Sequence, residues 1–386
     1  MPPGTSADRH VRLPYIDALR GIACLWVIFY HASIYGMPPF PEHSDPLLAP
    51  FNPHYAVSIG YLGVHLFLVL SGFCLTYPLL RRTPLSEVRL DLRDFARRRA
   101  KRILPPYYVA LALFAPIAYD ASSPLYHPTV WFDVPAHLLL IHNVFPETIN
   151  TINGSFWSLA LECQLYLLFP LLLGLARKYG FAPLLLLSLA IGVLWQRGCL
   201  AFPPPADTFE WNAPRFYAVP GRLFQFVCGM AAACLITEGR SIGPERISRG
   251  AMGTLAAIAP IAVLATRSAS SQFTVWADHL WAIVFAALVV TLHQESPARF
   301  EGRVGRIIVG VGTLSYSLYL VHQPLLQLIR GRLLTLTDLP PVVNSFVFWL
   351  FALPLVIMAG RVFYGLVESP KWRHSSRAVS GERSAV

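Results

Sequence analysis

The sequence predicts an all-α bundle of membrane-spanning helices, and three observations carry this prediction. Hydrophobic residues make up 55% of the 386 positions, whereas charged residues make up only 13%. A soluble domain has about 25% charged residues, so a chain of this length and composition lacks the polar side chains to cover a water-facing surface. Apolar runs of about 20 residues, the length that crosses the hydrocarbon core, recur along the chain. Membrane lipid is therefore the expected surrounding of most of the protein.

Ten apolar runs have the length of a membrane span. They are residues 14–35, 57–80, 104–121, 157–176, 181–198, 215–236, 250–266, 274–293, 306–328 and 343–366. A shorter apolar piece, 131–145, contains ionisable residues, which is typical of a re-entrant or interfacial segment. The membrane domain is expected to occupy residues 13–367, between polar tails at 1–12 and 368–386.

Basic residues between the apolar runs indicate the orientation of the chain in the membrane. Segment 81–102 contains nine lysines and arginines, whereas 36–56, 122–130 and 146–156 contain none. Cytosolic loops are enriched in Lys and Arg, so the pattern predicts a multi-pass protein of the plasma or inner membrane with both termini in the cytosol. The net charge of +10 has the same origin. Nucleic acid is not an expected partner, because the basic residues are not gathered on one soluble face.

The cysteines show neither a CxxC motif nor another metal-ligand spacing. Most of them lie inside apolar runs, where cysteine behaves as a small hydrophobic residue. The six positions are Cys24, Cys74, Cys163, Cys199, Cys228 and Cys234. No metal site is predicted.

Five ionisable residues are predicted to lie at a similar depth, in the outer half of their spans. They are His31, His65, Glu162, Arg222 and His322. Such side chains are costly within a bilayer unless they find a partner or line a water-filled cavity. One of them could be structural, but five at one level predict a hydrated polar cavity. Glu162 is expected to face His31 or Arg222.

Arg20 and His31 lie eleven residues apart in the first span. Eleven residues are close to three helical turns, so the two side chains share one helix face, roughly 16 Å apart along the axis. Asp17 lies three residues before Arg20 and can pair with it. The alternatives are a topology anchor for Arg20, extending to the headgroups, and a helix-end histidine for His31.

A second group of arginines, Arg98, Arg99 and Arg102, precedes the third span. Most clusters of this kind only fix the orientation of a membrane protein. The functional alternative is a site for an anionic group, because guanidinium groups match the geometry of phosphates.

The order of these motifs resembles that of the membrane-bound acyltransferase-3 family, which includes bacterial O-acetylases of lipopolysaccharide and other glycans and acylases of antibiotic sugars. The matching pieces are Asp17–Gly21 with His31, Gly63–Phe73, Arg98–Arg102, Trp157–Glu162 and Ser315–Pro324. Together they span nearly the whole chain. His65 departs from the family pattern, because this position is often acidic in its members.

The resemblance implies ten spans, a cytosolic acyl-CoA donor (acetyl-CoA in particular) and a central role in transfer for Arg20 and His31. It also implies donor handling by the arginines of 98–102 and a functional Glu162. The predicted reaction is O-acyl transfer to a hydroxyl of a carbohydrate or glycosylated acceptor. His31 is expected to act as general base, oriented by Glu162, and an acyl-histidine relay stays open as the alternative.

Further residues are candidates for binding the acceptor or stabilising the developing oxyanion. Arg222, Tyr316 and His322 are the candidates for both roles, and His65 and Trp157 complete the predicted acceptor site.

A proton-coupled transporter of a small polar or glycosidic substrate is the alternative function. Intramembrane His, Arg and Glu also mark transporters. Acyl transfer is favoured because no inverted repeat is visible and because the basic segment suits a phosphorylated donor.

Overall fold

A computed structural model describes most of the chain. The described residues are 13–36, 57, 59–123, 125–126, 130–202, 214–215, 217–238, 243–267, 271–294, 300–333 and 341–369. The predicted tail at 1–12, nearly all of the predicted tail at 368–386 and most of the segment 36–56 lie outside these ranges. Within them the protein has eleven α-helices and no strand, which confirms the predicted fold class.

The long helices coincide with the predicted spans. They are α1 (Pro14–Gly36), α3 (Leu62–Leu80), α4 (Leu92–Ala118), α6 (Phe156–Tyr179), α7 (Phe181–Ala201), α9 (Val219–Glu238), α10 (Pro244–Arg267), α11 (Ser271–His293), α12 (Arg303–Leu333) and α13 (Pro341–Phe363). Among the described residues, nine helices are long and apolar enough to cross a membrane. The remaining one, α4, is 27 residues long, but its first turns contain the basic cluster and lower its hydropathy.

The predicted short segment at 131–145 does not cross the bundle. It folds into the six-residue helix α5 (Asp133–Leu138) and a 3₁₀ turn at His142–Val144. Tyr107 and Tyr108 of α4 donate hydrogen bonds of 3.0 and 2.8 Å to carbonyl oxygens at the end of α5. A helix this short spans only about 9 Å, so the segment is no membrane span, and its re-entrant or interfacial placement stays a prediction.

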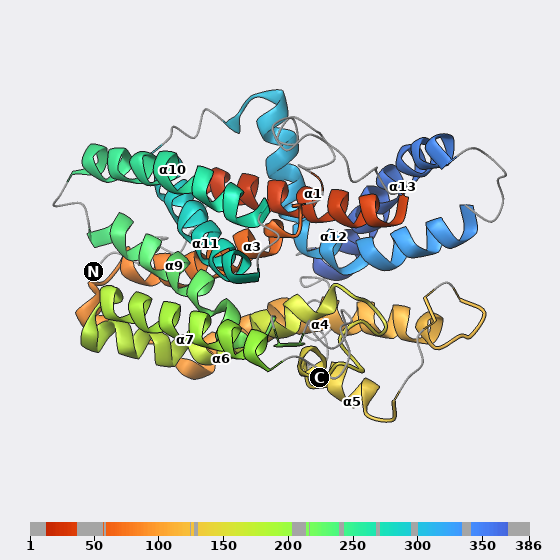
Figure 1. Ribbon diagram of the computed structural model, residues 1–386, viewed down its shortest axis with the longest axis horizontal. Helices are drawn as coiled ribbons and strands as arrows, with labels where there is room; N and C mark the ends of the chain where they lie inside the picture. The colour runs from red at the N-terminus through yellow and green to blue at the C-terminus, as the bar shows by residue number, and fades with distance from the viewer. Residues whose placement is uncertain are drawn as a thin grey trace, which may run out of the picture.

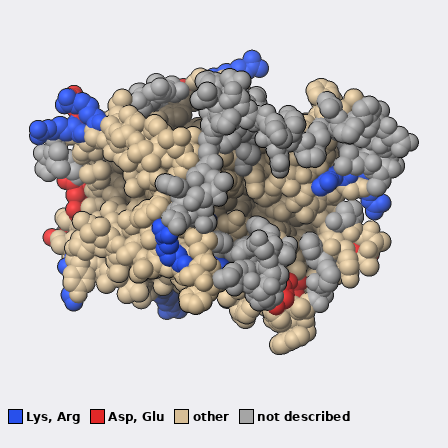
Figure 2. Space-filling model, viewed as in Figure 1, with Lys and Arg blue, Asp and Glu red and all other residues tan. Residues whose placement is uncertain are grey.

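Many large apolar side chains are exposed on the outside of the bundle, as expected of a surface that faces lipid. Large exposed side chains lie on the outer helices, for example Leu194 of α7, Leu264 of α10 and Phe351 of α13. Few charged side chains interrupt the surface in Figure 2. Side chains of this type face lipid without cost.

Helices α1 and α12 pack with their backbones in contact (Figure 1). A Cβ atom on Gly21 of α1 would overlap the carbonyl oxygen of Ile308, and one on Gly312 of α12 would overlap that of Asp17. Small residues permit this close approach of membrane helices. The contact fixes the relative position of the two helices that contain His31 and His322.

Helices α3 and α9 meet in the same way. A Cβ atom on Gly72 would overlap the carbonyl oxygen of Phe226, and one on Gly229 would overlap that of Val69. This contact fixes α3, with His65, against α9, with Arg222.

The α1–α12 contact gives a first prediction. Gly312→Ala should lower the free energy of unfolding by about 1–3 kcal/mol, because the new methyl group forces two helix backbones apart. The matched control is Gly310→Ala on the same helix, where an added Cβ meets nothing within 4 Å. Thermal unfolding of the detergent-solubilised protein compares the two variants. Equal melting temperatures for both would contradict the proposed backbone contact.

Candidate active site

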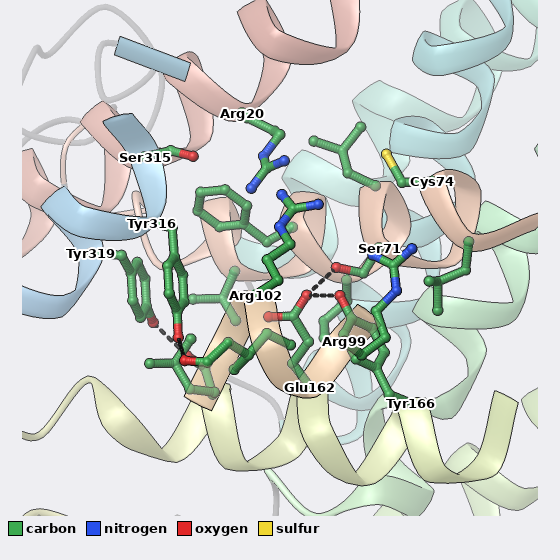
Figure 3. A pocket seen from close by; sticks show the side chains of 18 residues that line it. Arg20, Ser71, Cys74, Arg99, Arg102, Glu162, Tyr166, Ser315, Tyr316 and Tyr319 are labelled. Atoms are coloured by element: carbon green, nitrogen blue, oxygen red, sulfur yellow. Dashed lines mark hydrogen bonds between the residues drawn. The ribbon is translucent and has the colours of Figure 1, made fainter. Parts of the chain in front are cut away.

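A cavity of about 80 Å³ lies between α1, α3, α4, α6 and α12. Three arginines point into it, Arg20 from α1 and Arg99 and Arg102 from α4 (Figure 3). We call it the arginine cavity. Glu162 of α6 is the one carboxylate among its described lining residues, so three positive charges and one negative charge give the lining a formal charge of +2.

Glu162 is held by two hydroxyl groups inside the arginine cavity. Ser71 of α3 donates a hydrogen bond of 2.5 Å to its Oε1, and Tyr166, one turn further along α6, donates to the same oxygen (Figure 3). The expected contact of Glu162 with His31 or Arg222 is therefore wrong. The helix face of α6 that contains Glu162 and Tyr166 is turned toward α3 and α4.

The structure separates the predicted arginine cluster into two parts. Arg99 and Arg102 lie three residues apart on one face of α4 and line the cavity. The guanidinium of Arg99 lies 5.9 Å from the ring centres of both Phe95 and Tyr166, within range of a cation–π contact. Arg98 points elsewhere: its half-exposed side chain pairs with Asp94 one turn earlier, and it is not among the described lining residues.

A second cavity, of about 310 Å³, contains His31, His65 and Arg222 in its lining. We call it the histidine cavity. Val64, Leu68 and Tyr319 line both cavities. The sequence predicts one continuous passage from Arg20 to His31. The structure instead has two cavities that meet at a common wall of these three side chains.

His31 and His322 form a pair at the histidine cavity. His31 Nδ1 lies 3.2 Å from His322 Nε2 and 3.1 Å from the carbonyl oxygen of Val27. His322 is fully buried, and its Nδ1 lies 2.8 Å from the carbonyl oxygen of Tyr319.

These contacts assign the tautomers of both neutral rings. A carbonyl oxygen only accepts hydrogen bonds, so Nδ1 of His322 bears a hydrogen and its Nε2 accepts. Nδ1 of His31 then donates to His322 Nε2 and to the Val27 carbonyl oxygen. The other ring nitrogen of His31, Nε2, is left with a lone pair. A neutral histidine with a free lone pair beside a cavity has the form that a general base requires.

Arg222 finds a carboxylate partner that the sequence analysis missed. Its Nη1 lies 2.7 Å from Asp278 Oδ2 of α11 and 3.1 Å from His65 Nε2. Gln196 donates to the same carboxylate at 3.3 Å. The signal was present in the sequence, because Asp278 is an acidic residue inside the predicted span 274–293 and needs a partner there.

Aromatic and amide side chains complete the histidine cavity. Trp157 stacks on Tyr217 with ring centres 4.2 Å apart, and the guanidinium of Arg222 lies 5.2 Å from the ring centre of Tyr217. The other tyrosines in the lining are Tyr30, Tyr35, Tyr61 and Tyr319, and the amides are Asn150, Gln323 and Gln327. Planar aromatic faces beside hydrogen-bonding amides offer both apolar and polar contacts to a ligand.

Tyr316 lies in the arginine cavity, away from the other predicted acceptor residues (Figure 3). Its hydroxyl donates a hydrogen bond of 2.8 Å to the carbonyl oxygen of Ile103 at the start of the apolar part of α4. His65, Trp157 and Arg222 do share one cavity, as expected.

Within the described residues, no group of three or more His, Cys, Asp and Glu side chains is placed to hold a metal ion. All six cysteines are free thiols.

The sequence matches the acyltransferase domain family over residues 13–364. The chain belongs to the acyltransferase-3 family. It is an acyltransferase family enzyme, and the resemblance read from its motifs is confirmed.

Curated relatives cover this acyltransferase almost end to end. It is 28% identical to the acyltransferase MdmB of Streptomyces mycarofaciens over 97% of the chain and 94% of that protein. It is 26% identical to the peptidoglycan O-acetyltransferase OatA of Listeria monocytogenes, over 82% of the chain and 50% of the relative. The putative peptidoglycan O-acetyltransferase YrhL of Bacillus subtilis is also 26% identical, over 94% of the chain and 55% of the relative. The chain thus spans about half the length of the last two. No solved structure matches the sequence.

The buried pair of Arg222 and Asp278 gives the second prediction. Asp278→Ala should lower the free energy of unfolding by about 3–5 kcal/mol, because it leaves a buried guanidinium without its carboxylate. Asp94→Ala is the matched control: it removes the partner of the exposed Arg98 and should cost less than about 1 kcal/mol. Denaturant unfolding in detergent measures both variants. A loss for Asp278→Ala no larger than that of the control would contradict the assignment.

Proposed function

We propose that this acyltransferase moves an acyl group, with acetyl as the simplest case, from cytosolic acyl-CoA to a hydroxyl of a carbohydrate or glycosylated acceptor. The observation that carries the proposal is the pairing of the two cavities. One is cationic and the other contains an available histidine base, and the two share a wall. The name of the relative OatA, a peptidoglycan O-acetyltransferase, supports it.

The charge of the arginine cavity supports an anionic donor. Coenzyme A contains phosphates, and guanidinium groups bind phosphates through paired, charge-assisted hydrogen bonds. We assign Arg20, Arg99 and Arg102 to the donor, and place Arg98 at the outer rim, where only a part of the donor outside the cavity would meet it. The nine basic residues of segment 81–102 support an orientation with the α4 end of this cavity toward the cytosol.

The composition of the histidine cavity supports a neutral, hydroxyl-rich acceptor. Arg222 is matched by Asp278, so the ion pair adds no net charge. Trp157 and its neighbouring tyrosines offer flat apolar faces to sugar rings, and Gln323 and Gln327 offer amide groups to hydroxyls. The same chemistry is expected of a glycan or of a glycosylated small molecule.

In the proposed reaction His31 Nε2 takes the proton from the acceptor hydroxyl while that oxygen attacks the thioester carbonyl. The carbon–sulfur bond then breaks, the ester remains on the acceptor, and His31 returns the proton to the sulfur, so that CoA leaves as the thiol. His322 stabilises the imidazolium through its contact with His31 Nδ1 and so replaces Glu162 in the orienting role. Arg222 and His65 line the same cavity as His31 and are the candidates to donate to the oxyanion or to the acceptor.

An acyl-histidine relay through His31 Nε2 uses the same groups and stays the alternative sequence of steps. The transporter alternative has lost its main support, because the chain belongs to a family of acyltransferases. The membrane domain is proposed to run over 13–367, with cytosolic tails at 1–12 and 368–386.

The third prediction tests the base. His31→Ala in proteoliposomes should reduce CoA release from acetyl-CoA at least a hundredfold, because removing a general base costs about 10²–10⁴ in rate. The acceptors are a panel of neutral methyl glycosides, and thiol release is followed colorimetrically. His293→Gln, at the end of α11 and outside both cavities, is the matched control and should keep wild-type rates. Wild-type rates for His31→Ala would end the proposal.

The fourth prediction tests the donor site. Arg102→Gln and Arg20→Gln should each weaken CoA binding by about tenfold, the loss expected for one hydrogen bond to a charged group. Arg98→Gln is the control on the same helix and should change the affinity less, because its side chain points out of the cavity. Calorimetric titration of the purified protein with CoA measures all three. A larger loss for Arg98→Gln than for Arg102→Gln would contradict the assignment.

A further inference from the structure

Among the described residues, three side chains line both cavities and so form the wall between them. Val64 and Leu68 lie one turn apart on the same face of α3, and Tyr319 of α12 lines the same two cavities (Figure 3 shows its position beside the arginine cavity). Arg20 lies in one cavity and His31 in the other. A group carried from the arginine cavity to the histidine cavity therefore meets these three side chains.

Tyr319 has the largest side chain in the wall and is held by a single side-chain hydrogen bond. Its hydroxyl lies 2.6 Å from Ser158 Oγ of α6. Ser158 donates its own hydrogen to the carbonyl oxygen of Ser155 at 3.1 Å, so the hydroxyl of Tyr319 is the donor between the two. Its ring packs within a buried apolar cluster, with the ring centre of Phe67 5.9 Å away, edge-on, and that of His322 5.3 Å away.

The backbone carbonyl group of Tyr319 has a different role from its side chain. Its carbonyl oxygen accepts from His322 Nδ1 at 2.8 Å and so sets the tautomer of the histidine pair. A substitution of the Tyr319 side chain leaves this oxygen in place. The wall and the base are therefore experimentally separable at one residue.

We propose that Tyr319 is a specificity-determining residue that selects the acyl group by its width. This inference rests on the proposed function. The acyl end of the thioester leads as the donor reaches from the arginine cavity toward His31, so it passes between Tyr319 and the two aliphatic side chains of α3. Linear acyl chains of different length have the same cross-section, whereas a branch next to the carbonyl widens the group at the point of passage. The tyrosine ring excludes branched acyl groups and admits linear ones.

The test compares two donors with the same number of carbon atoms, butyryl-CoA and isobutyryl-CoA. Tyr319→Leu should raise kcat/KM for isobutyryl-CoA relative to butyryl-CoA by about tenfold, the lower end of the discrimination that one methyl group produces in an apolar site. Tyr319→Phe keeps the ring and should keep the wild-type ratio. Thiol release in proteoliposomes, with acetyl-CoA as reference donor and neutral methyl glycosides as acceptors, gives all the rates.

Two further variants protect the test against a folding defect. Val64→Ala widens the same wall from α3 with a smaller change and should move the ratio in the same direction. Phe169→Leu removes a buried ring of α6 that lines neither cavity, and it should leave the ratio unchanged.

The outcomes separate this inference from the proposed function. An unchanged ratio in both Tyr319→Leu and Val64→Ala, with an active wild type, overturns the role of Tyr319 and leaves acyl transfer standing. A shift in Phe169→Leu as large as that in Tyr319→Leu also overturns it. If the wild type releases no CoA from any donor with any acceptor, both proposals fall together.

Discussion

The arrangement of the site depends on two helix contacts without side chains between them. Gly21 and Gly312 let α1 touch α12, and Gly72 and Gly229 let α3 touch α9. Within lipid no hydrophobic force drives helices together, so close packing and interhelical hydrogen bonds carry the association. His31 Nδ1 and His322 Nε2 can lie 3.2 Å apart only while the backbones of their two helices stay in this contact. The same backbone geometry that stabilises the bundle therefore assembles the histidine pair.

The membrane spans could be predicted from the sequence because a lipid bilayer constrains the length and polarity of every helix that crosses it. It also pointed to most of the ionisable residues that line the two cavities, since such residues stand out against apolar runs and each needs a partner or a hydrated surrounding. The predicted depth of a residue follows from its distance to the helix end. The direction in which its side chain points cannot be derived from that distance, because successive side chains are about 100° apart around the helix axis.

The errors at individual residues have this common origin. Arg98 and Arg99 are neighbours in sequence, yet one pairs with Asp94 at the surface and the other lines a cavity. Glu162 was expected beside His31 because both were placed in an outer half-span, but its helix face is turned to Ser71. The partner of Arg222 came from α11, far along the chain. Only the packing of the helices decides which of several acids within reach becomes the partner.

The proposed transfer places two opposing demands on the region between the cavities. An acyl group has to pass, whereas a continuous polar channel from the three arginines to the histidine pair would also admit water and ions. Two aliphatic side chains and one aromatic ring meet both demands, because they form a barrier that is only one side chain thick. The energetic cost of moving Tyr319 is one hydroxyl–hydroxyl hydrogen bond, about 0.5–1.5 kcal/mol, together with its ring contacts. A bound acyl-CoA can supply that much through its contacts with the arginines, and an unbound ion or water molecule cannot.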